Sequence, residues 1–142
     1  MIERLTRVPL VPRGVDQYGS GAYGAPRGDH THHGIDLCCT PGDPILSHVS
    51  GTITKYGYPY DPYGPKGRMR YVEVTDSERY RHRFFYVRIL GHVGSAVRRG
   101  DIIGHAQNLQ AIYPGITDHI HYEVKPHRGG YEDPARWLDL EN

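Results

Sequence analysis

Hydrophobic and polar residues alternate along several short stretches of the chain, which is typical of strands that bury one face. The alternation is clearest over residues 70–75 and 81–90, and the polar residues 76–78 between them form a turn sequence. Further strands are predicted over residues 35–39, 45–49, 52–56 and 119–124. Helical stretches rich in alanine or leucine are missing, and only residues 133–138 predict a helical turn. The pattern therefore predicts a mainly β protein built on an antiparallel sheet.

Glycine and proline mark the connections between these strands. A Ser-Gly pair predicts a hairpin that joins the strands at 45–49 and 52–56. Residues 97–104 predict a β-turn between two further short strands. Residues 57–67 interleave glycine and proline with tyrosine, which predicts a long loop that serves function rather than packing. Residues 1–31 are expected to be mostly irregular and to wrap over the core.

The length of 142 residues suits one domain with its own core, and we divide the chain into an N-terminal extension over residues 1–13 and a domain over residues 14–142. A net charge of +1, without a basic arm or zinc-finger spacing, argues against nucleic-acid binding. No stretch reaches transmembrane length, so no membrane insertion is expected, and the first residues lack the apolar segment of a signal peptide. The adjacent Cys38 and Cys39 are expected to be buried or partly buried thiols rather than a disulfide.

Two histidine clusters carry the candidate chemistry. The first, His32-His33-Gly34-Ile35-Asp36, offers an imidazole and a carboxylate in His-x-x-x-Asp spacing. The second, His119-Ile120-His121, lies in an alternating run, so its two imidazoles point to the same face of a strand. Imidazole nitrogen and carboxylate oxygen are ligands of zinc, which keeps an open position when it is catalytic. The two clusters together predict a Zn²⁺ site with three ligands and one histidine beside it for proton transfer.

The order of motifs around these clusters resembles the lysostaphin/LytM-type zinc endopeptidases, a family that cuts the peptide cross-bridges of bacterial peptidoglycan. Agreement of several motifs in order is more specific than any one of them. The matching segments are residues 32–36, 40–45, 50–53, 97–104, 119–124 and 133–134. The resemblance implies the LytM-type, duplicated-hybrid-motif-like fold, in a single domain with long loops. It also implies that His32, Asp36 and His121 are the zinc ligands and that His119 is a catalytic histidine.

The family's Tyr-x-His strand lies over Tyr86-Val87-Arg88, so Arg88 stands where a second catalytic histidine is expected. Arginine stays protonated near neutral pH and is no base, but it can stabilise an oxyanion electrostatically. Arg88 is therefore the second candidate catalytic residue. Residues 85–88, together with residues 21–28 and 112–116, also resemble the leukocyte cell-derived chemotaxin type two-like members of this superfamily. That narrower resemblance implies the same fold and zinc site in a signalling protein without peptidase activity.

Several tyrosines and one carboxylate complete the candidate site. Tyr58 and Tyr60 are candidate substrate-binding residues, because tyrosine suits sugar or peptide contacts; packing of their loop onto the sheet is the alternative. Tyr23 is a third candidate, and either Tyr23 or Tyr18 matches the family's transition-state tyrosine. Glu123 shares a strand face with the second histidine cluster and is expected to orient an imidazole.

Two functional hypotheses follow. The first is a zinc-dependent endopeptidase that hydrolyses peptidoglycan peptide cross-bridges. From the missing export signal we expect a phage-borne protein, tail-associated or lytic, with phage tail or baseplate proteins as partners. Such a protein is virion-associated or released to the cell wall, and otherwise cytoplasmic until lysis. The second hypothesis is a catalytically inactive zinc-binding structural or recognition module of the same fold, for example a virion or baseplate component, which Arg88 favours.

Overall fold

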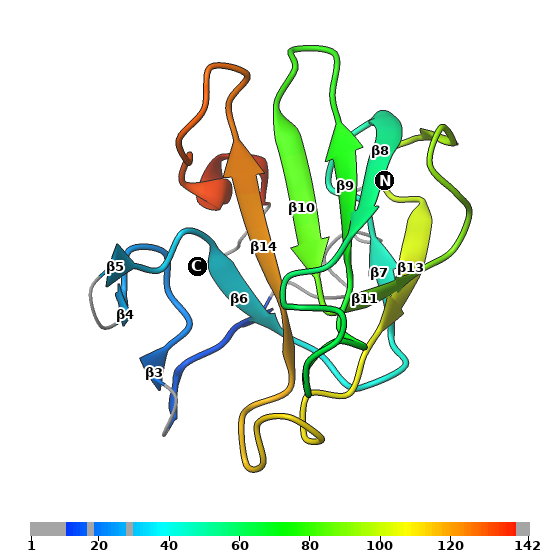
Figure 1. The fold of residues 1–142 in the computed structure, drawn as a ribbon. Coiled ribbons are helices and arrows are strands. Elements are labelled where there is room, and N and C mark those ends of the chain that lie inside the picture. The colour runs from blue at the N-terminus through cyan, green and yellow to red at the C-terminus, as the bar shows by residue number, and fades with distance from the viewer. Residues whose placement is uncertain (1–10, 17–18, 28–29, 139–142) are drawn as a thin grey trace.

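The computed structural model describes residues 11–16, 19–27 and 30–138, and its largest element is a seven-stranded antiparallel sheet (Figure 1). The order across this sheet is β1-β6-β14-β10-β9-β8-β12. The strands are β1 (Val11–Pro12), β6 (Ile35–Cys38), β14 (His119–Lys125), β10 (Arg81–Phe85), β9 (Tyr71–Thr75), β8 (Gly51–Gly57) and β12 (Ala96–Val97). The mainly β, antiparallel prediction is confirmed.

A three-stranded sheet in the order β11-β13-β7 lies beside the large sheet in Figure 1. Its strands are β11 (Val87–Ile89), β13 (Ile102–Ala106) and β7 (Pro44–Leu46). Side chains from both sheets form one hydrophobic core, in which Ile45, Val87 and Ile103 of the small sheet meet Leu37, Val72, Phe84, Ile120 and Tyr122 of the large one. The core therefore lies between the two sheets, where neither sheet needs a covering helix.

Short elements complete the fold near the chain ends. They are the paired strands β2 (Val15–Asp16) and β3 (Gly19–Ser20), the paired strands β4 (Pro26–Arg27) and β5 (His30–Thr31), and the 3₁₀ helix η1 (Pro134–Trp137). Asp133 caps η1 by accepting a hydrogen bond from the Ala135 amide, which confirms the predicted helical turn. Among the described residues there is no helix with the length and apolarity to cross a bilayer.

The central strands place their two faces in different surroundings. In β10, Phe84 pairs with Val72 and Tyr122 and is fully buried, whereas Phe85 pairs with Tyr71 and His121 and is half-buried. Because side chains alternate along a strand, Phe84 faces the core and Phe85 faces the opposite, polar side. That polar face carries the second histidine cluster.

The predicted hairpin between residues 45–49 and 52–56 is wrong. β7 pairs with β13 in the small sheet, whereas β8 pairs with β9 and β12 in the large one. Ile45 is 0% exposed and Ile53 is 2% exposed, so both strands turn an isoleucine into the core. They bury these side chains from opposite sides instead of pairing edge to edge, and the segment between them crosses from one sheet to the other.

The predicted continuous strand over residues 81–90 is also interrupted. Tyr86 has a φ of 70°, in the left-handed region that a tyrosine rarely adopts. β10 ends before Tyr86 in the large sheet and β11 begins after it in the small sheet. The break shifts the alternation by one residue, so that Val87 enters the core. The side chains of residues 86 and 88 consequently do not lie where simple alternation from β10 places them.

Most of the predicted N-terminal extension, residues 1–10, lies outside the described residues, and the domain division stays a prediction. Residues 11 and 12 pair with Leu37 and Cys38 as an edge strand of the large sheet. Cys38 and Cys39 are both half-buried free thiols, as the sequence predicts.

Phe84→Ala is expected to lower the free energy of unfolding by about 3–5 kcal/mol, because it leaves a cavity among Tyr122, His48 and the core. Phe85→Ala is the matched control, since it removes the same ring from the half-buried face and should cost clearly less. Urea unfolding of both variants measures the difference. Equal losses would contradict the assignment of the two strand faces.

Candidate metal centre

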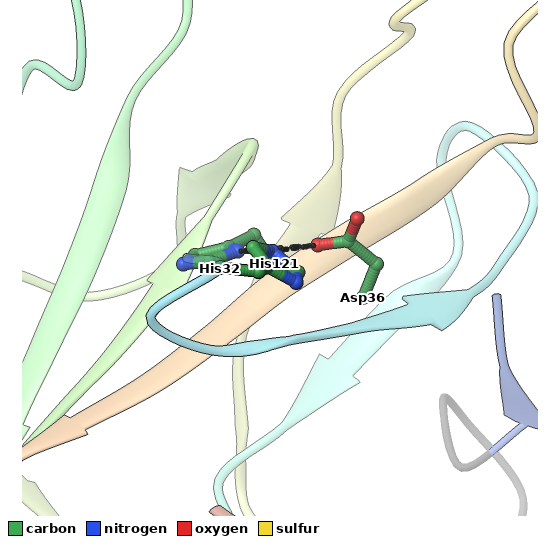
Figure 2. A group of neighbouring side chains, drawn as sticks. All are labelled: His32, Asp36 and His121. Atoms are coloured by element: carbon green, nitrogen blue, oxygen red, sulfur yellow. Dashed lines mark hydrogen bonds and ion pairs between the residues drawn. The ribbon is translucent and has the colours of Figure 1, made fainter. Parts of the chain in front are cut away.

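Three potential metal ligands converge on the polar face of the large sheet (Figure 2). His32 lies in the loop that leads into β6, Asp36 lies on β6, and His121 lies directly opposite Asp36 on β14. His32 Nε2 is 2.9 Å from His121 Nδ1, and each of these nitrogens is 3.1 Å from Asp36 Oδ1. The structure therefore brings together all three ligands that the resemblance implied, from segments far apart in the sequence.

The hydrogen bonds of the two ring nitrogens that point away from Asp36 show which nitrogen of each imidazole carries the hydrogen. His32 Nδ1 lies 2.9 Å from the Ala22 carbonyl oxygen, which can only accept, so this nitrogen carries the hydrogen. His121 Nε2 likewise donates to the Glu123 carboxylate at 2.9 Å. In their neutral forms both imidazoles therefore direct a lone pair at each other and at the Asp36 carboxylate. Such an arrangement is repulsive unless a proton or a cation lies among the three atoms.

The spacing of the three atoms suits a zinc ion. Metal–ligand bonds of about 2.0–2.1 Å in a tetrahedron place neighbouring ligand atoms about 3.3 Å apart. The observed separations of 2.9–3.1 Å are slightly shorter, so a small outward movement of the side chains opens the site. Two imidazoles and one carboxylate are also a donor set that zinc accepts, and they leave one tetrahedral position for a water or a substrate. The residues present therefore fit the metal.

Asp36 is held in place by Arg13. The Arg13 guanidinium donates to Asp36 Oδ2 at 2.6 Å, and the Arg13 amide donates to the Asp36 carbonyl oxygen at 2.7 Å. Both side chains are nearly fully buried. Burial opposes the charged carboxylate, but the hydrogen bonds with His121 and His32 outweigh it and hold the pKa of Asp36 well below its usual range. The carboxylate is thus ionised and aimed at the histidines.

A chain of charged side chains orients His121 from the other side. Glu123 lies 3.8 Å from Arg83, and Arg83 donates to Glu73 at 2.7 Å. Burial lowers the pKa of the His121 imidazole, but its bonds to Asp36 and Glu123 outweigh burial and raise that pKa to about 9. This geometry confirms that Glu123 orients an imidazole, as its position on the strand predicts.

Gly34 allows the first cluster to approach the second. A Cβ at this position would lie 2.4 Å from the Tyr122 carbonyl oxygen and 2.8 Å from His121 Cε1. These separations are shorter than van der Waals contact, so no other residue fits without moving His121 or β14. The glycine of the His-x-x-x-Asp segment therefore serves close packing.

His119 lies beside the three ligands but is fixed by a different contact. Its Nδ1 donates to the Thr117 carbonyl oxygen at 2.7 Å, so its Nε2 carries the lone pair and lies 3.4 Å from Asp36 Oδ2. Burial lowers the pKa of His119, which favours the neutral imidazole at neutral pH. A neutral imidazole with a free Nε2 next to a metal centre is able to accept a proton.

A pocket of about 360 Å³ opens over this centre. Its walls include His33, Pro59, Tyr60, Phe85, Tyr86, Tyr113 and Ile116. The Tyr60 hydroxyl lies 2.9 Å from that of Tyr86 and 2.8 Å from that of Tyr113, and Lys66 donates to the Tyr113 hydroxyl at 3.0 Å. The ring of Tyr86 meets the ring of His119 edge-on, with centroids 5.7 Å apart. The Tyr86 ring therefore lies beside the predicted proton acceptor, and its hydroxyl is linked through that of Tyr60 to that of Tyr113.

The placement of Arg88 in the site is wrong. Its side chain is exposed, it pairs across the small sheet with His105, and it does not line the pocket. The chain passes from the large sheet to the small one at the left-handed residue Tyr86, and in the small sheet Val87 is buried in the core while Arg88 is exposed. Tyr86, two residues earlier, lines the pocket and contacts His119.

The three predicted substrate-binding tyrosines separate in the structure. Tyr60 lines the pocket, whereas Tyr23 and Tyr58 do not. Tyr58 packs against the Arg70 guanidinium at 4.0 Å, and Tyr23 is exposed. Tyr18 lies outside the described residues. Sequence reasoning missed Arg13, for which no motif exists, and Tyr86 and Tyr113, which lie in segments quoted only for their resemblance.

Gly34→Ala is expected to weaken zinc binding by about tenfold or more, because the new methyl group displaces the His121 ring. Gly14→Ala is the matched control, since nothing lies within 4 Å of its added Cβ. Competition with a chromophoric chelator measures both affinities. Equal affinity in the two variants would contradict the role given to Gly34.

In zinc-free protein, the free energy of unfolding is expected to fall by on the order of 3 kcal/mol between pH 6.5 and 9. The pKa of His121 in the folded protein, about 9, lies above the ordinary histidine value of 6.5. The stabilisation by charged His121 is therefore complete below pH 6.5 and is lost as the pH rises through 9. Glu123→Gln removes one of the charges that raise this pKa, so its decline should be smaller. Urea unfolding in the presence of a chelator measures the free energy of unfolding of the wild type and of Glu123→Gln at each pH. An equal decline in both proteins would contradict the expectation.

Known proteins share both the sequence and the fold of this chain. The model of peptidase family M23 matches residues 30–134. Mouse leukocyte cell-derived chemotaxin-2 is 31% identical over 111 residues, which cover 78% of this chain and 71% of that protein. Chicken myeloid protein 1 is 28% identical over 122 residues, which cover 78% of this chain and 34% of that protein.

Among solved structures, the catalytic domain of the antimicrobial peptidase lysostaphin from Staphylococcus simulans aligns with a TM-score of 0.66 and 19% identity, covering 99% of this chain and 98% of that one. At this identity the likeness concerns the fold alone. The matched region of the family model contains both histidine clusters and all three potential metal ligands, whereas Arg13 and Ala22, which contact two of these ligands, lie before it. The sequence match, the ligand geometry and the shared fold agree, and the chain belongs to peptidase family M23.

Proposed function

We propose that this chain is a zinc-dependent endopeptidase that hydrolyses the peptide cross-bridges of bacterial peptidoglycan. The observation that carries the proposal is the convergence of three ligand lone pairs with the free Nε2 of His119 beside them. Membership of a peptidase family supports it. The fold shared with lysostaphin, itself described as an antimicrobial peptidase, also supports it.

The chain's own residues account for the proton transfers. A zinc ion bound by His32, Asp36 and His121 would supply Lewis acidity toward a peptide carbonyl and would acidify a water molecule. His119 Nε2 accepts the proton that the attacking water loses as its oxygen bonds to the carbonyl carbon. The same imidazole then gives this proton to the leaving amine as the C–N bond breaks. Hydrolysis thus returns His119 to its neutral form.

Tyr86 takes the electrostatic role that the sequence assigned to Arg88. Burial raises the pKa of the Tyr86 phenol well above its usual range, so the hydroxyl keeps its proton and can donate it in a hydrogen bond. A donor aimed at the carbonyl oxygen of the substrate stabilises the negative charge that develops there. The contact between the Tyr86 and Tyr60 hydroxyls keeps the donor in place before the substrate arrives.

The pocket walls suit a peptide. Pro59, Phe85 and Ile116 offer apolar contacts, and the hydroxyls of Tyr60 and Tyr113 offer hydrogen bonds to backbone amides. The roles predicted for Tyr23 and Tyr58 stay predictions. Delivery by a bacteriophage tail or baseplate, or release to the wall at lysis, likewise stays a prediction.

One observation favours a second candidate function, a zinc-binding recognition module that does not hydrolyse its ligand. The residue next to His119 is a phenol whose pKa burial raises well above its usual range, so it stays protonated and is no base at neutral pH. If two bases are needed, the pocket then binds a peptide without cutting it. The relative with 31% identity is named for chemotaxis rather than for proteolysis.

Zymography on purified cell walls separates the two candidates. We expect the wild type to clear the gel, His119→Ala to lose about 10²–10⁴-fold in rate, and Tyr86→Phe to lose about 10²–10³-fold. Arg88→Ala is the matched control and should clear like the wild type, because Arg88 is exposed outside the pocket.

Clearing by His119→Ala at the wild-type rate would contradict the proposed proton acceptor. If Arg88→Ala lost clearing while Tyr86→Phe kept it, Arg88 and not Tyr86 would be the residue that stabilises the oxyanion. A zinc-loaded wild type that clears no wall preparation, yet binds soluble wall peptide, would establish the second candidate instead.

A further inference from the structure

A second histidine site lies on the other side of the large sheet. His48 follows β7 and is 3% exposed. Its ring meets the rings of Phe84 and Tyr122 edge-on, with centroids 5.6 and 4.9 Å away. Phe84 and Tyr122 face the core, whereas their neighbours Phe85 and His121 face the metal centre. His48 is therefore separated from the metal centre by the thickness of the sheet.

Neither ring nitrogen of His48 has a hydrogen-bond partner among the described residues. A neutral imidazole has one N–H donor and one acceptor, and leaving both unpaired in the interior costs free energy. Buried polar groups in native proteins nearly always find a partner. Burial first, then the nearby His82 and Arg99, lowers the pKa of His48 to about 3, so the ring is neutral. A neutral ring without a partner in the protein points to a partner from outside it.

His48 lines a hollow of about 560 Å³. The other walls come from the turns after β7, β9 and β12 and from the C-terminal 3₁₀ helix with the residue that follows it. They are Val49, Ser50, Ser77, Arg99, Arg136, Trp137 and Leu138. None of these residues lines the pocket over the metal centre. The hollow is thus a separate cavity with its own chemistry.

The polar walls of this hollow are mostly hydrogen-bond donors. The Arg99 guanidinium has no hydrogen bond or ion pair within the part of the chain that the structure describes, although the Arg99 amide donates to Ser50 Oγ at 2.9 Å. Since Ser50 Oγ accepts there, its own hydroxyl hydrogen is left to donate. Arg136 is a weaker candidate, because it already donates to the Tyr80 hydroxyl at 3.0 Å and lies 3.7 Å from Glu132.

We propose that this hollow is a binding site for a small oxyanion, a carboxylate or a phosphate, held by Arg99, the Ser50 hydroxyl and an N–H of His48. An oxyanion accepts several hydrogen bonds at once and pairs with a guanidinium in a fork-shaped contact. It supplies the acceptor that the buried imidazole lacks. The proposal is independent of the peptidase function, because it shares no residue with the metal centre.

Titration of the zinc-loaded full chain with inorganic phosphate, and separately with acetate, tests the site. The NMR signals of the His48 ring, assigned by their loss in His48→Phe, report on this site alone. We expect them to shift and saturate with at least one of the two anions, and the tighter anion identifies the ligand class. Arg99→Ala should weaken that response by at least tenfold.

Arg98→Ala is the matched control, since Arg98 is the exposed neighbour on the same turn and does not line the hollow. It should bind like the wild type. Equal weakening in Arg98→Ala and Arg99→Ala would reduce the effect to general surface charge and overturn the site. His48 signals that respond to neither anion, or shifts confined to His32, His119 and His121, would overturn it as well.

Discussion

The pairing of β14 with β6 is the constraint on which the site depends. Their antiparallel register sets His121 directly opposite Asp36, and the alternation of β14 puts His119 and Glu123 on the same face. His32, four residues before Asp36, then needs only the turn at Gly34 to bring its imidazole to the same point. A shift of one residue in this register would turn every one of these side chains of β14 toward the core.

Hydrogen bonds from the surrounding residues fix the orientation and the tautomer of each ligand side chain. Each of the three ligands has one atom that is hydrogen-bonded to a neighbouring group, which leaves its other atom directed at the other ligands. The neighbouring groups are the Ala22 carbonyl, the Glu123 carboxylate and the Arg13 guanidinium. The Thr117 carbonyl does the same for His119. A metal ion therefore meets ligands whose tautomers are already set, and it does not have to reorient them.

Much of this arrangement could be predicted from the sequence, because strand alternation is a local property. The shared face of His119, His121 and Glu123 follows from spacing alone, and ligand chemistry adds His32 and Asp36. Arg13 escaped prediction, since its contact with Asp36 depends on an edge strand that no local pattern marks. The sheet to which β7 belongs was also mispredicted, because a Ser-Gly pair fits a sheet-to-sheet crossing as well as a hairpin turn.

Tyr86 shows the limit of such reasoning most clearly. Its left-handed backbone is stabilised by tertiary contacts, among them the bonds of the Tyr86 and Val87 amides to the Arg70 carbonyl oxygen at 2.7 and 3.2 Å. A break held by long-range bonds leaves no signature in the alternation of residues 81–90. The resemblance to the family's Tyr-x-His strand placed Arg88 in the site, whereas Tyr86 lines the pocket. The two candidate functions differ chiefly in what a phenol at this position does.

Metal analysis of purified variants tests the central claim most directly. We propose that His32, Asp36 and His121 bind zinc and that His119 lies beside the metal without being a ligand. We therefore expect one zinc per chain in the wild type and in His119→Ala, and loss of stoichiometric zinc in His121→Ala. Undiminished zinc in His121→Ala, or equal loss in His119→Ala, would contradict it.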